Sequence, residues 1–206
     1  MEPPQQPLSI CFYDKKEPFY EFSNFFTNKN SKPIVFINDL YWRSTEQYFQ
    51  AAKFFLPESA RHMEYYNIIQ STDSPMKCVI LGQQKIKGGY AGKWVVNKLT
   101  DDRTLNDVIH QYSDLAILPD WHTDRDDIMY TALTFKFTQN KDLEKMLIKT
   151  GTTEIIEASP RDNYWGWGAD KQGKNMLGKI LMRVRSDLQT VRPLRPNGLA
   201  SLQTRT

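Results

Sequence analysis

The chain has 206 residues, of which 40% are hydrophobic and 13% aromatic, and its formal net charge is +3. This length suffices for one domain with a substantial core and is too short for two large domains. The small positive charge permits a phosphate-bearing ligand or a nucleic acid without requiring either. No run approaches the length of a membrane span, and the first residues lack the pattern of a signal peptide, so we expect a soluble cytoplasmic or nuclear protein without membrane association.

The residue types that bind metals or form disulfides occur in no recognisable spacing. Cys11 and Cys78 are far apart, and His62, His110 and His122 are scattered along the chain. Structural zinc sites need closely spaced ligands, and a disulfide between the two cysteines is not expected. We therefore predict neither a metal site nor a cofactor.

The predicted architecture is one α+β domain, mostly α-helical with a few short β-strands. We expect a flexible arm at residues 1–8, the domain at 9–190 and a flexible basic tail at 191–206. Short apolar runs predict strands at Ser9–Tyr13, at Pro33–Leu40 with a hairpin turn at Asn38-Asp39, and at Thr153–Ala158. Apolar spacing and capping residues predict helices at Trp42–Leu56, Arg61–Ile69, Pro75–Leu81, Asp124–Phe137, Lys141–Thr150 and Asn175–Leu188. A loop is expected at Gln83–Trp94, and a short helix with irregular chain at Leu99–Leu118.

The segment Pro18–Phe26 is dense in aromatic residues and contains the pair Ser23-Asn24 in its middle. A Ser-Asn pair favours a turn over regular structure. Two interpretations stay open. The segment is either an ordinary hydrophobic loop, or a rigid loop that directs the Asn24 amide into a binding site.

The helix predicted at Trp42–Leu56 is apolar around most of its surface, which indicates a buried helix. Glu46, Gln50 and Lys53 nevertheless follow one another at the spacing i, i+4, i+7, so they line one stripe of this helix. One interpretation is a buried ion pair that ties the helix to the fold. The other is a pocket in which desolvation and mutual charge tune the carboxylate and the amine for chemistry.

The stretch Glu157–Asn175 combines acidic and amide side chains with tryptophans and glycines. Its glycines allow the backbone to approach a ligand closely, and Trp165 offers a flat face to a heterocyclic ring. Lys174 and the N–H groups at the start of the next helix can hold a phosphate. Because the Walker and dinucleotide spacings are absent, a glycine-rich connector with buried tryptophans is the alternative.

Five motifs in a fixed order make the chain resemble the NADAR (YbiA-like) family over roughly Ile10–Leu188. They are Phe22–Phe25, Ser44–Phe54, Ser74–Met76, Glu157–Gly168, and Asn175–Gly178 together with Leu181–Arg185. The resemblance implies an N-glycosidase that acts on ribose–amine linkages. Family activities are of two kinds: cleavage of phosphoribosylamino-pyrimidine intermediates of riboflavin synthesis, and removal of ADP-ribose from the exocyclic amine of guanine in nucleic acid.

The chemistry implied by this resemblance gives the polar stripe a role. The ribose of such a compound can open to an imine-like C1, to which Lys53 would add as a Schiff base while Glu46 moves protons. The competing mechanism is direct hydrolysis, with Glu46 or Asp162 activating water. We predict Glu46, Lys53 and Asp162 as catalytic residues, and Asn24, Gln50, Trp165, Lys174 and Asn175 as substrate-binding residues.

Two features depart from the family pattern. Gln47 stands where aligned relatives carry histidine, so an obligatory base is not expected at this position. The segment Gln83–Leu118 is longer than in compact bacterial members. Its glycines and lysines either contact a nucleic-acid backbone or belong to a variable surface insertion.

Three hypotheses about the substrate remain. The positive charge and the arginine-rich end favour ADP-ribosylated guanine in DNA or RNA, or a related ADP-ribose compound. The arginines in question are Arg183, Arg185, Arg192, Arg195 and Arg205. No deaminase or reductase segment links the chain to riboflavin synthesis, so a phosphoribosylamino-pyrimidine is second. A non-catalytic module that binds ADP-ribose or an NAD metabolite is third, because such a module would not need a buried amine beside a carboxylate.

Overall fold

The computed structural model of the chain describes residues 9–30, 32–83 and 103–190. The arm expected at 1–8, the tail expected at 191–206 and nearly all of the loop expected at 83–94 lie outside the described residues. In chain order the elements are β1 (Ser9–Phe12), the 3-10 helix η1 (Tyr20–Phe22), β2 (Val35–Ile37), β3 (Leu40–Trp42), α1 (Thr45–Ala52), α2 (Ala60–Ser71), α3 (Pro75–Gly82), α5 (Arg103–Gln111), α6 (Trp121–Gln139), α7 (Lys141–Lys149), β4 (Glu154–Glu157) and α8 (Met176–Thr190). The domain is therefore mainly helical with a few short strands, as predicted.

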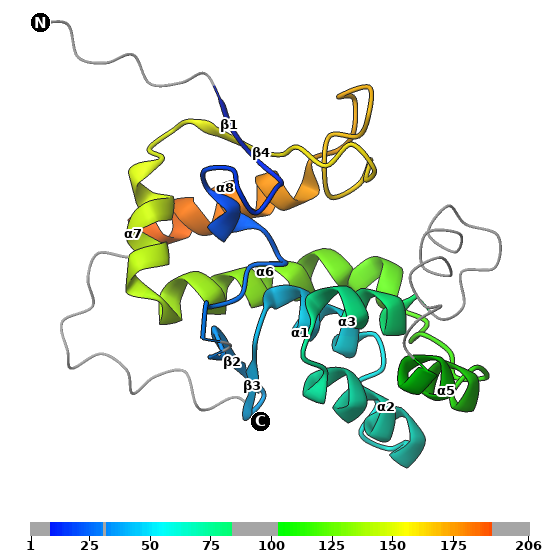
Figure 1. Cartoon of the computed structure of the whole chain (residues 1–206). Helices are drawn as coiled ribbons and strands as arrows, with labels where there is room; N and C mark the ends of the chain where they lie inside the picture. Colours follow the sequence, from blue (N-terminus) through cyan, green and yellow to red (C-terminus); the bar gives the residue numbers. More distant parts are fainter. Residues whose placement is uncertain (1–8, 31, 84–102, 191–206) are drawn as a thin grey trace, which may run out of the picture.

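Helix α6 runs across the middle of the molecule (Figure 1). The β1–β4 pair and α8 lie on one side of it, and the β2–β3 hairpin and α1–α3 lie on the other. Strands β1 and β4 pair in parallel, from Ser9 opposite Glu154 to Phe12 opposite Glu157. Within the described residues, no helix combines the length and the apolar character that a membrane crossing requires.

The interior contains two hydrophobic clusters, and helix α1 lies between them. One cluster joins α2, α3, α5 and the hairpin, and the other joins β1, β4, α6, α7 and α8. From α1, Ala51 belongs to the first cluster and Phe49 to the second. Helix α6 is divided in the same way, with Ala132 in the first and Leu133 in the second. The polar stripe predicted on the first helix therefore lies where the two clusters meet.

Ser44 and Thr45 are the candidate N-caps in the predicted stretch Trp42–Leu56, and the structure confirms Ser44 as the cap, whereas the C-terminal end of helix α1 comes earlier than predicted. The first residue of that range belongs to β3, and the helix starts after Ser44, whose side chain caps its N-terminus. At the other end, the Lys53 carbonyl accepts a hydrogen bond from the N–H of Leu118 at 3.0 Å. This tertiary contact takes the place of a helical hydrogen bond, and α1 ends at Ala52.

The hairpin turn predicted at Asn38-Asp39 is confirmed. Both residues have positive φ angles, 54° and 60°. Two consecutive residues in this conformation form the type I′ turn that matches the twist of a two-residue hairpin, and Asn and Asp tolerate it better than most residues.

Gln47 connects α1 to the end of α2. Its Nε2 donates to the carbonyl oxygens of Ile69, Gln70 and Thr72 at 3.3, 2.6 and 2.8 Å, and its Oε1 accepts from the Arg43 N–H at 2.8 Å. The last carbonyls of a helix have no partner within the helix, so this amide supplies the missing donor. The position at which aligned relatives are expected to carry histidine is therefore a structural contact in this chain.

Replacing Gln47 with methionine, which has a similar volume, should lower the free energy of unfolding by about 3 kcal/mol, because buried carbonyls and an N–H lose their partner. Urea denaturation followed by circular dichroism measures this loss. The matched control is Gln70→Met, which removes one hydrogen bond to the Tyr41 carbonyl at a more exposed position. An equally small loss in both variants would contradict the structural role of Gln47.

Candidate active site

The polar stripe of α1 is buried at the junction of the two clusters. Glu46, Gln50 and Lys53 have relative exposures of 6%, 4% and 8%. The Gln50 Nε2 donates to Glu46 Oε1 at 2.6 Å, and the Lys53 Nζ donates to the Gly82 carbonyl, at the end of α3, at 3.1 Å. Among the described residues no direct ion pair joins Glu46 to Lys53, so the two groups are held separately by an amide and a carbonyl.

Gly82 allows the end of α3 to come close to this stripe. A Cβ at this position would lie 2.8 Å from Gln50 Cδ and 3.1 Å from Gln50 Cβ, which is too close without displacing the side chain. The Gln50 Oε1 that packs there has no hydrogen-bond partner within the described residues. An unpaired buried acceptor costs about 1–3 kcal/mol. Such an unfavourable arrangement is typical of a functional site.

The amine of Lys53 lies in an aromatic corner. Its Nζ is 5.8 Å from the centre of the Phe49 ring and 5.4 Å from that of the Trp121 ring. Burial lowers the pKa of Lys53 to about 8, and the attraction of Glu46 offsets part of that effect. The rings stabilise a cation less well than water does, so an appreciable fraction of the amine is neutral near pH 7. A neutral amine is a nucleophile.

The Glu46 carboxyl favours its protonated form. Burial raises its pKa, the hydrogen bond from Gln50 and the charge of Lys53 lower it, and the carboxylate of Asp162 raises it again. The backbone at this end of α1 is held by Asn24, whose carbonyl accepts from the Glu46 N–H at 3.1 Å and whose Oδ1 accepts from the Thr45 hydroxyl at 3.2 Å. Asn24 therefore lies beside the reactive carboxyl, where we predicted a binding residue.

Asp162 begins the turn that positions Trp165 next to helix α1. The Asp162 Oδ1 accepts from the N–H groups of Tyr164 and Trp165 at 2.8 and 2.7 Å. The Trp165 ring packs edge-to-face on Phe49 at 5.3 Å, next to the Lys53 corner. Asp162 is only half-buried, and its second oxygen makes no hydrogen bond with a described residue. The structure thus brings both predicted residues to the α1 stripe.

The other two residues predicted in this stretch have different surroundings. The Asn175 Oδ1 accepts from the Glu157 N–H at 3.0 Å, and its Nδ2 donates to the Ile155 carbonyl at 2.9 Å. Its amide thus joins β4 to the start of α8, and we assign it a positioning role. Lys174 is exposed, with its Nζ 5.1 Å from the centre of the Tyr164 ring, so it lies at the rim.

Two charged residues that were not predicted complete the site. Glu157, at the end of β4, is 8% exposed; burial and the charges of Asp162 and Glu46 raise its pKa to about 8, against the attraction of Lys136. Lys136, on α6, is fully buried and donates to the Ser23 carbonyl at 2.8 Å. Burial lowers its pKa to about 7.

The sequence contains a weak signal for both residues. The positions three and four residues before Lys136 are Leu133 and Ala132, which are both buried, so the lysine continues an apolar face. Glu157 follows the buried Ile155 by two residues, so strand alternation places both side chains on the same, inner face. Together with Glu46, Lys53 and Asp162, these residues form a cluster of three carboxyl groups and two amines, in which the charges of neighbouring members shift the pKa values of Glu46, Lys53, Glu157 and Lys136.

This arrangement supports proton transfer and nucleophilic attack by an amine. A proton donor and a neutral amine are both present near pH 7, in a space that desolvates them. Within the described residues, no group of three His, Cys, Asp or Glu side chains is arranged to hold a metal ion.

Replacing Glu157 with glutamine should change how stability depends on pH. The buried carboxyl keeps its proton up to about pH 8, whereas the unfolded chain loses it near 4.5. Wild-type stability therefore falls as the pH rises through this window, by up to about 1.4 kcal/mol per unit, and the variant escapes this loss. Urea denaturation from about pH 5 to about pH 7, below the titration of Lys136, should show a growing advantage of the variant.

The control is Glu154→Gln at the exposed start of the same strand, whose difference from the wild type should stay constant across this range. A constant difference for Glu157→Gln as well would mean that Glu157 ionises at its ordinary pKa in the folded protein.

Comparison with known proteins identifies the family. N-glycosidase Npun_R5314 of Nostoc punctiforme is 30% identical over 184 residues, covering 89% of this chain and 95% of that protein. N-glycosidase YbiA of Escherichia coli is 28% identical over 183 residues, and its NMR structure superimposes with a TM-score of 0.65, covering 90% of this chain and 87% of that one. The chloroplastic riboflavin biosynthesis protein PYRR of Zea mays is 28% identical over 185 residues, which are only 26% of its length. Because the NADAR domain model also matches residues 11–189, this chain belongs to the NADAR domain family.

Proposed function

We propose that the protein is an N-glycosidase that hydrolyses the bond between C1 of a ribose and the exocyclic amine of a heterocycle, and that its substrate is ADP-ribosylated guanine in nucleic acid. The observation that supports this reaction best is Lys53, a buried amine of lowered pKa beside a buried carboxyl group. The names of the Nostoc and E. coli relatives describe the same class of reaction.

In the proposed mechanism the ribose ring opens first. The proton of the exocyclic nitrogen moves to the ring oxygen, and a C1=N bond forms. The neutral amine of Lys53 adds to C1, and Glu46 gives its proton to the heterocyclic nitrogen while the lysine nitrogen loses one. Glu46 takes up the proton that the lysine nitrogen loses and gives it to the heterocyclic nitrogen as a second proton. The C1–N bond to the heterocycle then breaks, the heterocycle leaves as its free amine, and C1 stays attached to Lys53 as a protonated Schiff base beside the Glu46 carboxylate. Water then hydrolyses this bond, with Glu46 as the proton acceptor.

The competing mechanism needs no covalent intermediate. Glu46 or Asp162 would remove a proton from a water molecule as it attacks C1, and Lys53 would only balance charge. The raised pKa of Glu46 favours a proton donor over a proton acceptor in the resting site. We therefore favour the Schiff-base mechanism over direct attack by water.

The rim of the site suits the two phosphates and the second base of an ADP-ribose group. The Arg125 guanidinium lies 3.7 Å from the centre of the Tyr164 ring, and the Lys174 Nζ lies 5.1 Å from it. Trp165 is partly exposed next to this ring, at 5.2 Å between centroids. Two cations and an aromatic face thus lie beside the α1 stripe. A substrate with one phosphate would use only part of this surface, whereas the two phosphates and the second base of ADP-ribose would use all of it.

The arginine-rich end gives this proposal less support than we expected from the sequence. Arg185 is buried and donates to the Thr150 hydroxyl and the Thr153 carbonyl, both at 2.7 Å, so it holds α8 in the fold. Arg183 is exposed, with its guanidinium 4.0 Å from the Tyr130 ring. The remaining three arginines of this group lie outside the described residues.

A phosphoribosylamino-pyrimidine remains the second candidate substrate. The observation in its favour is the name of the maize relative, which is a riboflavin biosynthesis protein. Both substrates present a phosphorylated ribose whose C1 is bonded to an amine on a heterocycle, so the same residues would act on either.

Sodium borohydride, added during the reaction with a guanine-ADP-ribosylated oligonucleotide, should trap an adduct on the wild-type protein, because it reduces a Schiff base to a stable amine. Intact-protein mass spectrometry detects this adduct, and chromatography follows the release of ADP-ribose. Lys53→Met, which keeps the volume of the side chain, should form no adduct and should react at least about a hundredfold more slowly.

The matched control is Lys179→Ala at an exposed position on α8, which should keep both adduct and rate. Release without an adduct would favour direct attack by water. Cleavage of a phosphoribosylamino-pyrimidine but not of the oligonucleotide would establish the second substrate. Tight binding without any product, unchanged in Lys53→Met, would indicate a non-catalytic module.

A further inference from the structure

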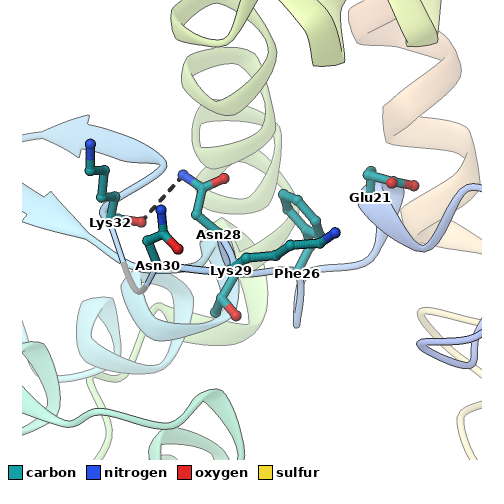
Figure 2. Close-up of a pocket in the computed structure, with 7 residues that line it drawn as sticks. Glu21, Phe26, Asn28, Lys29, Asn30 and Lys32 are labelled. Carbon is teal, nitrogen blue, oxygen red and sulfur yellow. Dashed lines mark hydrogen bonds between the residues drawn. The ribbon is translucent and has the colours of Figure 1, made fainter.

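A hollow of about 500 Å³ lies beside the loop between η1 and β2 (Figure 2). Its polar lining comes mainly from Asn28, Lys29, Asn30 and Lys32, and Phe26 and Glu21 lie at its other end. We call this surface the loop groove. It is separate from the α1 stripe, and nothing in the proposed mechanism uses it.

The lining of the loop groove is suited to an anion. Lys29 and Lys32 are exposed, and neither forms an ion pair within the described part of the chain. The Asn28 amide donates to the Lys32 carbonyl at 3.4 Å and closes the loop, while the Asn30 amide makes no hydrogen bond with a described residue. Lys32 lies at one end of the groove and the Lys29 side chain extends toward Phe26, so two cations are spread along a lining whose one carboxylate is that of Glu21.

Two exposed aromatic rings stand on the hairpin that follows this loop. Phe36 and Tyr41 are 39% and 63% exposed, lie opposite each other across β2 and β3, and pack with their ring centres 4.7 Å apart. An exposed apolar patch that is rimmed by polar residues can mark an interaction surface. Aromatic faces beside a positively charged groove are the combination that binds single-stranded nucleic acid, because bases stack on the rings while cations follow the phosphates.

The hairpin is held rigidly before any ligand binds. The Gln139 side chain, at the end of α6, accepts from the Phe36 N–H at 2.7 Å and donates to the Phe36 carbonyl at 2.9 Å. The Asn140 amide donates to the Ile34 carbonyl at 2.6 Å. A surface that is already ordered loses little conformational entropy on binding.

The loop groove is also connected to the site. The Lys136 Nζ, which donates to the Ser23 carbonyl, lies 5.4 Å from the centre of the Phe26 ring. Phe26 lines the groove, so the same short loop touches the charged cluster on one side and the groove on the other. The groove and the surroundings of Lys136 therefore share the Phe26 ring.

We propose that the loop groove and the Phe36–Tyr41 pair bind the unmodified part of a single-stranded nucleic acid, next to the nucleotide that is cleaved. The phosphates contact Lys29 and Lys32, and a base stacks on Tyr41. This inference rests on the nucleic-acid substrate proposed above, and it assigns the recognition of the polymer to a surface outside the site.

The test compares polymer with monomer. Lys29→Glu/Lys32→Glu should lower kcat/KM on an ADP-ribosylated single-stranded oligonucleotide by about tenfold or more and leave kcat/KM on ADP-ribosylated guanosine unchanged. Fluorescence anisotropy with an unmodified, fluorescein-labelled thymidine strand should show a similar loss of affinity. The slope of log affinity against log salt should fall by about 1.4, since each phosphate contact contributes about 0.7.

Two further variants sharpen the result. Lys145→Glu/Lys149→Glu on α7 makes the same change of charge outside the groove and should have less than a third of the effect on the labelled strand. Tyr41→Ala should weaken binding of that strand roughly tenfold without changing the salt slope, because stacking releases no counterions. Its backbone contact with Gln70 does not depend on the side chain.

The outcomes separate the two proposals. Equal losses on oligonucleotide and guanosine substrates, or unchanged anisotropy in the charge-reversed variant, would overturn the loop groove as a polymer site. If the wild type cleaves neither ADP-ribosylated compound, the proposed substrate fails, and the anisotropy series still decides whether the groove binds nucleic acid. If Lys29→Glu/Lys32→Glu fails to fold, Lys29→Gln/Lys32→Gln takes its place with the same expected direction.

Discussion

The removal of water from one stripe of helix α1 determines the character of the whole site. Packing between two hydrophobic clusters leaves Glu46 and Lys53 with few solvating partners, and each group is supplied with a specific one. The Gln50 amide donates a hydrogen bond to the carboxyl group, and a carbonyl oxygen at the end of α3 accepts one from the amine. Desolvation opposes charge on both groups, so each moves toward its neutral form. A lysine with a lowered pKa beside a carboxyl group with a raised one is unusual in water.

The same constraint extends across the molecule to residues on other elements. Glu157 and Lys136 arrive from β4 and α6, and they respond to burial as the residues of α1 do. The charge on one of these groups therefore shifts the pKa of its neighbours, and a measured pKa reflects the set as well as the single residue.

Features that depend on nearby residues could be predicted from the sequence. The Asn38-Asp39 turn follows from turn chemistry, and α3 begins at Pro75 after Ser74 as its pattern indicates. The stripe on α1 follows from helical spacing. The C-terminal end of α1 could not be placed, because Leu118, which is distant in sequence, donates a hydrogen bond to the Lys53 carbonyl.

Features that depend on distant contacts escaped the sequence analysis for the same physical reason. The sequence does not distinguish an asparagine that contacts a substrate from one that, like Asn175, forms hydrogen bonds with two backbone groups of β4. The sequence placed Arg185 in an arginine-rich end of the chain, yet its guanidinium forms buried hydrogen bonds within the fold. Glu157 shares the inner face of β4 with Ile155, but a glutamate at such a position in a short strand is too weak a signal to identify a site residue. The roles of the individual side chains at the site stay predictions.

The parallel pairing of β1 with β4 also bears on how the protein is made. Ser9 pairs with Glu154 in these strands. Strand β1 therefore stays unpaired during synthesis until most of the domain has left the ribosome. Contacts between such distant residues slow folding, and a free strand edge invites association with other chains. Glu157 lies at the end of this late pair, so the charged cluster is incomplete until β4 has been synthesised. A nascent chain truncated before residue 154 would therefore carry Glu46 and Lys53 and still lack an assembled site.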